Sequence, residues 1–130
     1  MPNDIDTPVF TTGAAARLCG VPMARWRAWW ARTPVARLGK KVSRSWRFSR
    51  RDMYVISLWA TLLNHGHGPP HAALQTARLV AGHRGPTVYV TRDGDEIAVT
   101  SEPPAGPALA IPTSEIWRRV AQAEEEQCIL

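Results

Sequence analysis

The chain has 130 residues, of which 45% are hydrophobic, so it has room for one small domain or for a small domain with an appendage. It contains neither a secretory leader nor an apolar run near the roughly twenty residues of a membrane span, which predicts a cytoplasmic protein without a membrane partner. Its two cysteines form neither a zinc-binding spacing nor a disulfide framework.

The net charge of +5 conceals a strong asymmetry along the chain. Residues 1–51 contain eleven Lys or Arg and two Asp, whereas residues 52–130 contain five Lys or Arg and nine acids. No acid occurs between residues 9 and 51. Codon usage in a GC-rich genome would explain the excess of Arg over Lys, but it does not explain why the cations gather at the front. The asymmetry favours a polyanion as the partner of the first half.

Two short helices are predicted at the start of this basic half. Thr11 or Thr12 is expected to cap a helix over residues 13–19, because its hydroxyl can accept a hydrogen bond from the first turn. Gly20 then supplies a turn, and a second helix is predicted from Met23 to about Arg32. Two helices joined by a tight turn are the pattern of a helix-turn-helix.

The second helix is predicted to have one apolar face and one basic face. Trp26 is assigned to the core. Arg25, Ala28, Trp29 and Arg32 share an adjoining face at helical spacing. Two interpretations of Trp29 stay open: it packs in the core, or, lying beside Arg, it contacts the sugar and phosphate of a nucleic acid.

A basic segment over residues 38–48 follows, in which apolar and basic residues alternate after Gly39. This pattern predicts a short β-hairpin. The residues from Ser49 to Asp52 match a capping box with Asp in place of Glu, and they open a third helix that runs to about His65. A fourth helix is predicted over residues 70–81, after a turn rich in Gly and Pro.

The remaining part of the chain predicts β structure and one more helix. Residues 87–92 and 95–100 favour strands, and Asp93-Gly94 between them is a favoured two-residue turn. An edge strand is predicted over residues 108–111. Such a turn places two apolar pairs on one face, Val90 with Ile97 and Val88 with Val99.

A final helix is predicted from Thr113 or Ser114 to about Glu125. Because a hairpin and one helix make a thin core by themselves, this part is a candidate dimerisation element. The alternative is that it only completes the core of its own chain. The apolar residues that would form the dimer contact are Val88, Val90, Ile97, Val99, Ile116, Trp117 and Val120.

The first half of the chain resembles the MerR-type winged helix-turn-helix domain, which is also seen in phage excisionases. The family opens with an aromatic residue, Ser or Thr, and a Gly- and Ala-bearing helix that ends in Gly-Val; the matching residues are Phe10, Thr11, Gly13, Ala16, Leu18, Gly20 and Val21. Its recognition helix carries Thr-Leu-Arg-x-Tyr, where this chain has residues 25–29. By that match Arg27 and Trp29 hold positions that usually touch the DNA backbone.

The family's wing usually ends in Arg-x-Tyr-Ser-x-x-Asp, and residues 46–52 correspond to it with Trp46 in place of the usual Arg. The resemblance ends after about residue 81, where MerR regulators usually continue into a long dimerisation helix. It implies an α+β fold, mainly α, in which a winged helix-turn-helix is followed by a β-hairpin and a C-terminal helix. The expected division is a flexible leader (1–9), a DNA-binding domain (10–82) and the candidate dimerisation element (83–130).

The expected site follows from these assignments. The recognition helix enters the major groove, where Arg25 reads a base edge, most simply a guanine, and Met23 touches a thymine methyl group. The basic hairpin lies along an adjacent groove. The expected DNA contacts are Met23, Arg25, Arg27, Trp29, Arg32, Lys40, Lys41, Arg44 and Arg47.

Three functions stay open. The first is a sequence-specific double-stranded DNA-binding protein, a transcriptional regulator that acts as a homodimer. The second is an excisionase-like or phage-type protein for recombination, DNA architecture or packaging. The third is an antitoxin-like interaction module whose acidic C-terminal helix holds a basic protein.

Neither an enzyme, nor a cofactor, nor a metal site is expected. The histidines (His65, His67, His71 and His83) have zinc-like spacing, but the first two lie in a Gly/Pro turn without Cys or acid nearby. The acids Asp93, Asp95 and Glu96 fall at a hairpin tip, where solvated charge is usual.

Overall fold

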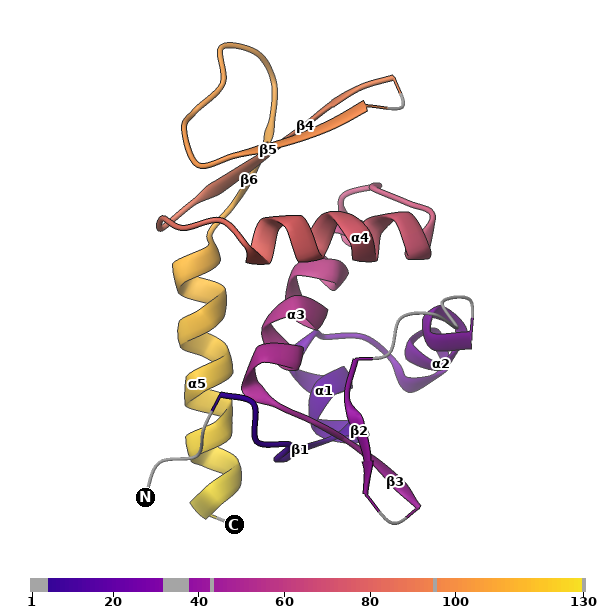
Figure 1. Ribbon diagram of the computed structural model, residues 1–130. Coiled ribbons are helices and arrows are strands. Elements are labelled where there is room, and N and C mark those ends of the chain that lie inside the picture. The colour runs from indigo at the N-terminus through magenta and orange to yellow at the C-terminus, as the bar shows by residue number, and fades with distance from the viewer. Residues whose placement is uncertain (1–4, 32–37, 43, 95, 130) are drawn as a thin grey trace.

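The computed structural model describes residues 5–31, 38–42, 44–94 and 96–129. These residues form five helices and two antiparallel sheets of three strands each (Figure 1), in agreement with the mixed fold class predicted. In chain order the elements are β1 (Phe10–Thr11), α1 (Thr12–Leu18), α2 (Met23–Ala31), β2 (Lys40–Val42), β3 (Ser45–Phe48), α3 (Arg50–Asn64), α4 (Pro70–Ala81), β4 (Val88–Asp93), β5 (Glu96–Thr100), β6 (Leu109–Ile111) and α5 (Thr113–Ile129).

Helix α1 begins after one of its two predicted caps, and helix α2 begins at the predicted residue. The hydroxyl of Thr11 accepts a hydrogen bond from the backbone N–H of Ala14 at 3.1 Å, so Thr11 rather than Thr12 caps α1. Gly20 takes a positive φ of 66°, which turns the chain between α1 and α2 at little cost for a glycine. Helix α2 begins at Met23 as predicted, and Arg32 lies outside the described residues.

The predicted hairpin over residues 38–48 is confirmed as β2 and β3, and β1 adds a third strand in the order β1-β3-β2. Phe48 opposes Phe10 across the first pair of strands, and both rings are buried. Gly39, at φ +89°, precedes β2. A Cβ there would lie 2.7 Å from the ring of Phe48, so no other residue fits this bend.

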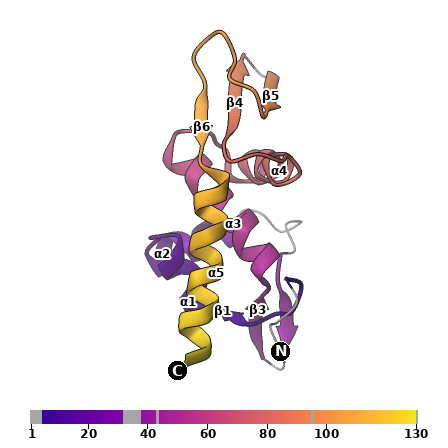
Figure 2. The same cartoon turned by 90° about the vertical axis from the view of Figure 1, so that its left-hand side faces the viewer.

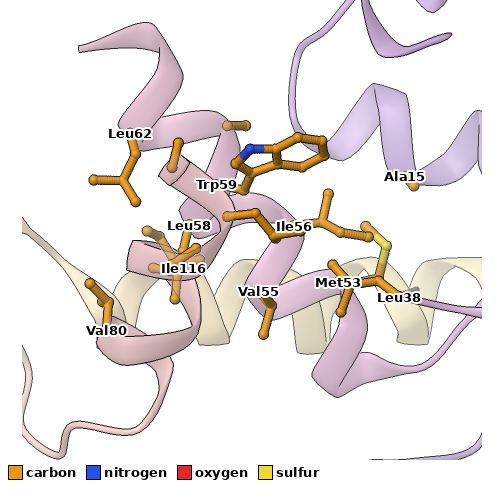
Figure 3. Close-up of a cluster of buried hydrophobic side chains, with 14 of the residues drawn as sticks. Ala15, Leu38, Met53, Val55, Ile56, Leu58, Trp59, Leu62, Val80 and Ile116 are labelled. Atoms are coloured by element: carbon orange, nitrogen blue, oxygen red, sulfur yellow. The ribbon is translucent and has the colours of Figure 1, made fainter. Parts of the chain in front are cut away.

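Helix α3 is the centre of the core. Its predicted capping box is confirmed, because Ser49 and Asp52 exchange hydrogen bonds between side chain and backbone, each at 3.0 Å. The indole N–H of Trp59 donates to the carbonyl of Pro70 at 2.9 Å, which fixes the start of α4 against α3. Side chains from four helices and from Leu38 gather here (Figure 3): Ala15, Leu38, Met53, Val55, Ile56, Leu58, Trp59, Leu62, Val80 and Ile116.

Helix α4 has the predicted bounds, from Pro70 to Ala81. It lies across the end of α3, and the second sheet covers its other side (Figure 1). The predicted edge strand is confirmed as β6, which pairs with β4 in the order β5-β4-β6. The second sheet therefore rests on α4 and stands away from the first sheet.

The predicted register of the hairpin is wrong by two residues. Val90 opposes Val99 instead of Ile97, and Val88 opposes Ile111 of β6 instead of Val99. The turn begins one residue later than predicted, with Gly94 at φ +61° as its first residue, and Asp95 lies outside the described residues. A shift of two residues keeps every side chain on its own face, so the alternation of apolar residues does not distinguish the two registers.

Helix α5 runs beside α3 and extends to Ile129, beyond the predicted end near Glu125, because no helix-breaking residue follows.

Residues 5–9, which precede β1, are hydrogen-bonded to α3 and to the end of β3. The carbonyl of Ile5 accepts from the N–H of Arg51, and the N–H of Val9 donates to the carbonyl of Phe48, each at 3.0 Å. None of the described helices is long and apolar enough to cross a membrane.

Candidate nucleic-acid interface

Helix α2 is divided into an aromatic inner face and a basic outer face. The prediction that Trp26 is in the core is confirmed, because only 2% of its surface is exposed. Its ring stacks on Trp30 at 5.5 Å and meets Phe48 edge-on at 6.1 Å. Arg25 and Arg27, one residue on either side of Trp26, are both exposed, and Arg27 borders the same hollow as Trp26 and Trp30. The aromatic stack therefore holds α2 while its guanidinium groups stay in solvent.

The other predicted contacts on α2 lie in different surroundings. Met23, at the start of the helix, is 36% exposed. Trp29 is half-buried, with its ring 5.5 Å from the ring of Trp59, so it packs against the core and keeps only part of its surface for a ligand.

The hairpin β2–β3 carries the second set of predicted cations. Lys40, Lys41 and Arg44 are exposed, and Arg47 is half-buried. Lys40 stands directly opposite Arg47 in the strand register, so the two cations share one face of the sheet. Like charges in directly opposed positions destabilise a sheet unless an anion lies between them. This pair is therefore a feature that folding alone does not favour.

A hollow of about 250 Å³ joins α2 to the hairpin. This hollow was not predicted from the sequence, although the helical spacing of the tryptophans on α2 indicated an aromatic face there. It is mostly apolar, and Arg27 of α2 and Trp46 of β3 both border it, so it lies between the two elements that carry the cations. Lys41, which opposes Trp46, shares the face of the sheet that borders the hollow, whereas Lys40 and Arg47 lie on the other face. The residues that line it are Thr12, Trp26, Arg27, Trp30, Ala31, Trp46 and Phe48.

The cations of this surface have no internal counter-charge in the described part of the chain. The ion pairs there join Arg50 to Glu124, Arg51 to Asp6 and Arg118 to Glu115, and none includes a cation of α2 or of the hairpin. The acidic helix α5 lies on the opposite side of the molecule from α2 (Figures 1 and 2). The cations of α2 are thus separated in space from the four glutamates of α5.

The residues of the candidate dimerisation element lie mostly inside the chain. Val88, Val90, Ile116 and Val120 are at most 2% exposed and belong to the same core as α3. Ile97, Val99 and Trp117 are half-buried, and Trp117 meets Tyr54 edge-on at 5.0 Å. The chain itself already uses most of the apolar surface that these residues would offer to a partner.

The acidic helix also uses part of its charge internally. Glu124 is 4% exposed and accepts a hydrogen bond from the guanidinium of Arg50, whereas Glu125 and Glu126 are exposed. The carboxylates that a basic protein partner can reach on this helix therefore include Glu125 and Glu126 but not Glu124.

The side chains that could hold a metal ion or act as a nucleophile were compared in position and pKa. No three His, Cys, Asp or Glu side chains within the described ranges lie close enough to share a metal ion. Burial, followed by the charges of Arg92 and His65, lowers the pKa of His67. Burial raises the pKa of the Cys19 thiol to about 11, so it stays neutral at physiological pH and is a poor nucleophile.

Comparison of the sequence with models of protein families and with curated proteins gives no match. The charge and exposure of the side chains on α2 and the hairpin are therefore the features that indicate a function. A basic, solvent-exposed helix beside a basic hairpin is an arrangement suited to a phosphate backbone.

Proposed function

We propose that this protein is a sequence-specific, non-enzymatic double-stranded DNA-binding protein, a transcriptional regulator that acts as a homodimer. Residues 10–82 serve as a winged helix-turn-helix, with α2 as the recognition helix and β2–β3 as the wing. The observation that carries the proposal is the set of exposed cations on α2 and the hairpin, without internal counter-charge among the described residues. Cations are costly to gather in this way unless a polyanion neutralises them.

The exposed side chains of α2 support contacts with base edges in the major groove. Arg25 lies close to the N-terminus of the helix, the end that contacts base edges in helix-turn-helix proteins. Its planar fork suits the two acceptors of guanine. Met23 meets a thymine methyl group, while Arg27 and the exposed edge of Trp29 hold the sugar and phosphate.

The opposed cations of the hairpin support a role in holding phosphate. A phosphate between Lys40 and Arg47 converts their repulsion into two attractions. Lys41, on the other face of the sheet beside Trp46, and Arg44, at the turn, contact further phosphates. These side chains fix the position of the protein on the duplex but carry no sequence information.

Two copies are needed because one such module covers little DNA. Single modules bury roughly 600–1,000 Å² of protein surface, at the low end for specific recognition. Since Val88, Val90, Ile116 and Val120 are enclosed in their own chain, the contact between copies uses other surfaces or is made on adjacent half-sites.

Selection of bound sequences from random duplex DNA at physiological salt tests the proposal. We expect enrichment of a motif with two half-sites, bound by two chains. Binding that enriches no sequence and only fades as salt rises would leave a basic surface without specificity, and would contradict the proposal.

The variant Arg25→Ala/Arg27→Ala tests the assignment of the recognition helix. Loss of a base contact costs about 1–3 kcal/mol and relaxes specificity at its position, while loss of a phosphate contact weakens all sequences equally. The matched control is Arg118→Ala/Arg119→Ala, which removes the same charge from exposed positions of α5. If the first variant selects the same motif with undiminished affinity, α2 is not the recognition helix.

A further inference from the structure

A second groove lies where α3, α4 and α5 meet. It has a volume of about 400 Å³, and its lining includes no residue of α2 or of the hairpin. It is formed by the start of α3, the end of α4 and the first turns of α5, which runs along the side of the molecule opposite α2 (Figures 1 and 2). The residues that line it are Arg51, Tyr54, Val55, Arg78, Ala81, Gly82 and Trp117.

The floor of this groove is aromatic and rigid. Tyr54 and Trp117 meet edge-on at 5.0 Å, and both rings are half-buried, so each leaves part of its apolar surface open. Aromatic rings that are fixed by neighbours offer a large contact area and lose little conformational freedom when a partner binds.

The rim of the groove carries two exposed guanidinium groups. The Nε–H of Arg51 donates to the carboxylate of Asp6 at 2.8 Å, and both side chains are more than half exposed. Arg78 forms no ion pair with a described residue. The rim therefore already holds one carboxylate, in an exposed contact that solvent and other acids can exchange.

We propose that this groove, here called the Arg51–Arg78 groove, binds an acidic peptide segment of a partner protein. Carboxylates of the peptide are held by Arg51 and Arg78, and an apolar side chain packs on Trp117 and Tyr54. The occupant follows from charge complementarity, because the chain's own Asp6 shows which chemistry the rim accepts. The inference is independent of DNA binding, since the two surfaces share no residue.

The test uses the full chain and a short fluorescent peptide that alternates glutamate with leucine. Fluorescence anisotropy should show binding that weakens by roughly tenfold in Arg51→Glu/Arg78→Glu, because two ion pairs become repulsions. The matched control, Arg84→Glu/Arg92→Glu, makes the same charge change at exposed positions outside the groove and should bind like the wild type. Arg78→Glu alone, which breaks no ion pair, covers the case in which the double variant is less stable.

Four outcomes would overturn the proposal. Equal weakening in both double variants would show attraction to net charge alone. Equal binding of a peptide with glutamine for glutamate would show that carboxylates are not recognised. A wild-type dimer that Arg51→Glu/Arg78→Glu converts to a monomer, without peptide binding, would assign the groove to a second copy. Displacement of the peptide by duplex DNA would assign it to phosphate.

Discussion

The two halves of this molecule both bury apolar side chains, but they differ in the charges that they leave exposed. Helix α2, in the basic half, buries Trp26 deeply and leaves two arginines in solvent. In the second half, Val88 and Ile116 are enclosed by α3 and α4. The first half exposes cations to solvent, and the second half completes the hydrophobic core. Exposure of charge without counter-charge, more than the amount of charge, separates a binding face from a structural one.

The packing of the second half also explains why so short a chain folds around one helix. A hairpin and one helix have too little apolar surface for a core of their own. Here the second sheet rests on α4, with contacts from β5, and α5 lies against α3. The second half thereby adds to the core to which the basic half contributes Phe10, Trp26 and Phe48.

The largest expected effect comes from Ile116→Ala. Truncation of a buried Ile costs about 2–5 kcal/mol of unfolding free energy, because it loses transfer energy and leaves a cavity. Urea unfolding measures it, and the difference between the variant and the wild type should not depend on protein concentration. Leu79→Ala, at a position 56% exposed, is the control and should change stability by less than about 0.5 kcal/mol. A difference that changes with protein concentration would instead place Ile116 at an interface between copies.

A smaller effect is expected from Glu124→Ala. It leaves the guanidinium of Arg50, whose side chain is 23% exposed, without this carboxylate, and should cost roughly 2 kcal/mol in the same assay. Asp6→Ala breaks the neighbouring exposed pair with Arg51 and should cost at most about 0.5 kcal/mol. Equal losses of unfolding free energy in the two variants would mean that burial of an ion pair does not change its contribution to stability. That result would contradict the expected difference between the core and the exposed surface.

Lys40→Ala/Lys41→Ala should weaken DNA binding without destabilising the fold. If both side chains contact phosphate, the slope of log affinity against log salt falls in magnitude by about two. Because Lys40 opposes Arg47, unfolding free energy should stay constant or rise by a few tenths of a kcal/mol, with about 1 kcal/mol as the upper limit. A loss of stability with an unchanged salt slope would show that the two lysines stabilise the fold and do not contact phosphate.

The smallest effect at neutral pH concerns Cys19, whose Sγ lies 4.0 Å from the hydroxyl of Ser57 on α3. Burial raises the pKa of the thiol from 9.0 to about 11, so the folded state holds its proton more tightly than the unfolded state. Stability from this group is present below pH 9 and falls as the pH rises towards 11. In a Cys128→Ser background, alkylation near pH 8 should be about a hundredfold slower in the folded chain than in urea, from thiolate content alone. Equal rates would show an exposed thiolate.

Chain-local chemistry accounts for the features that were predicted correctly. The capping box of Ser49 and Asp52, the start of α2 and the bounds of α4 depend on residues within one or two helical turns. The assignment of Trp26 to the core depends only on its helical spacing. These interactions are complete within a short segment, so the segment alone predicts them.

Features that depend on distant partners were not predictable in the same way. The hairpin register was missed because two registers bury the same faces, and the position of the turn, with Asp93 opposite Glu96, distinguishes them. The hollow between α2 and β3 needs Trp30 and Trp46 to be placed by different elements. The Arg51–Arg78 groove likewise draws on three helices.

The sequence by itself determined the segregation of charge, the helix starts and the alternation of the strands, because each is a property of neighbouring residues. The tertiary structure decided which apolar residues are enclosed and which cations stay unpaired, because burial and ion pairing depend on segments far apart in the chain. For this protein that decision separates Ile116, a core residue, from Arg25 and Arg27, which remain exposed for a ligand.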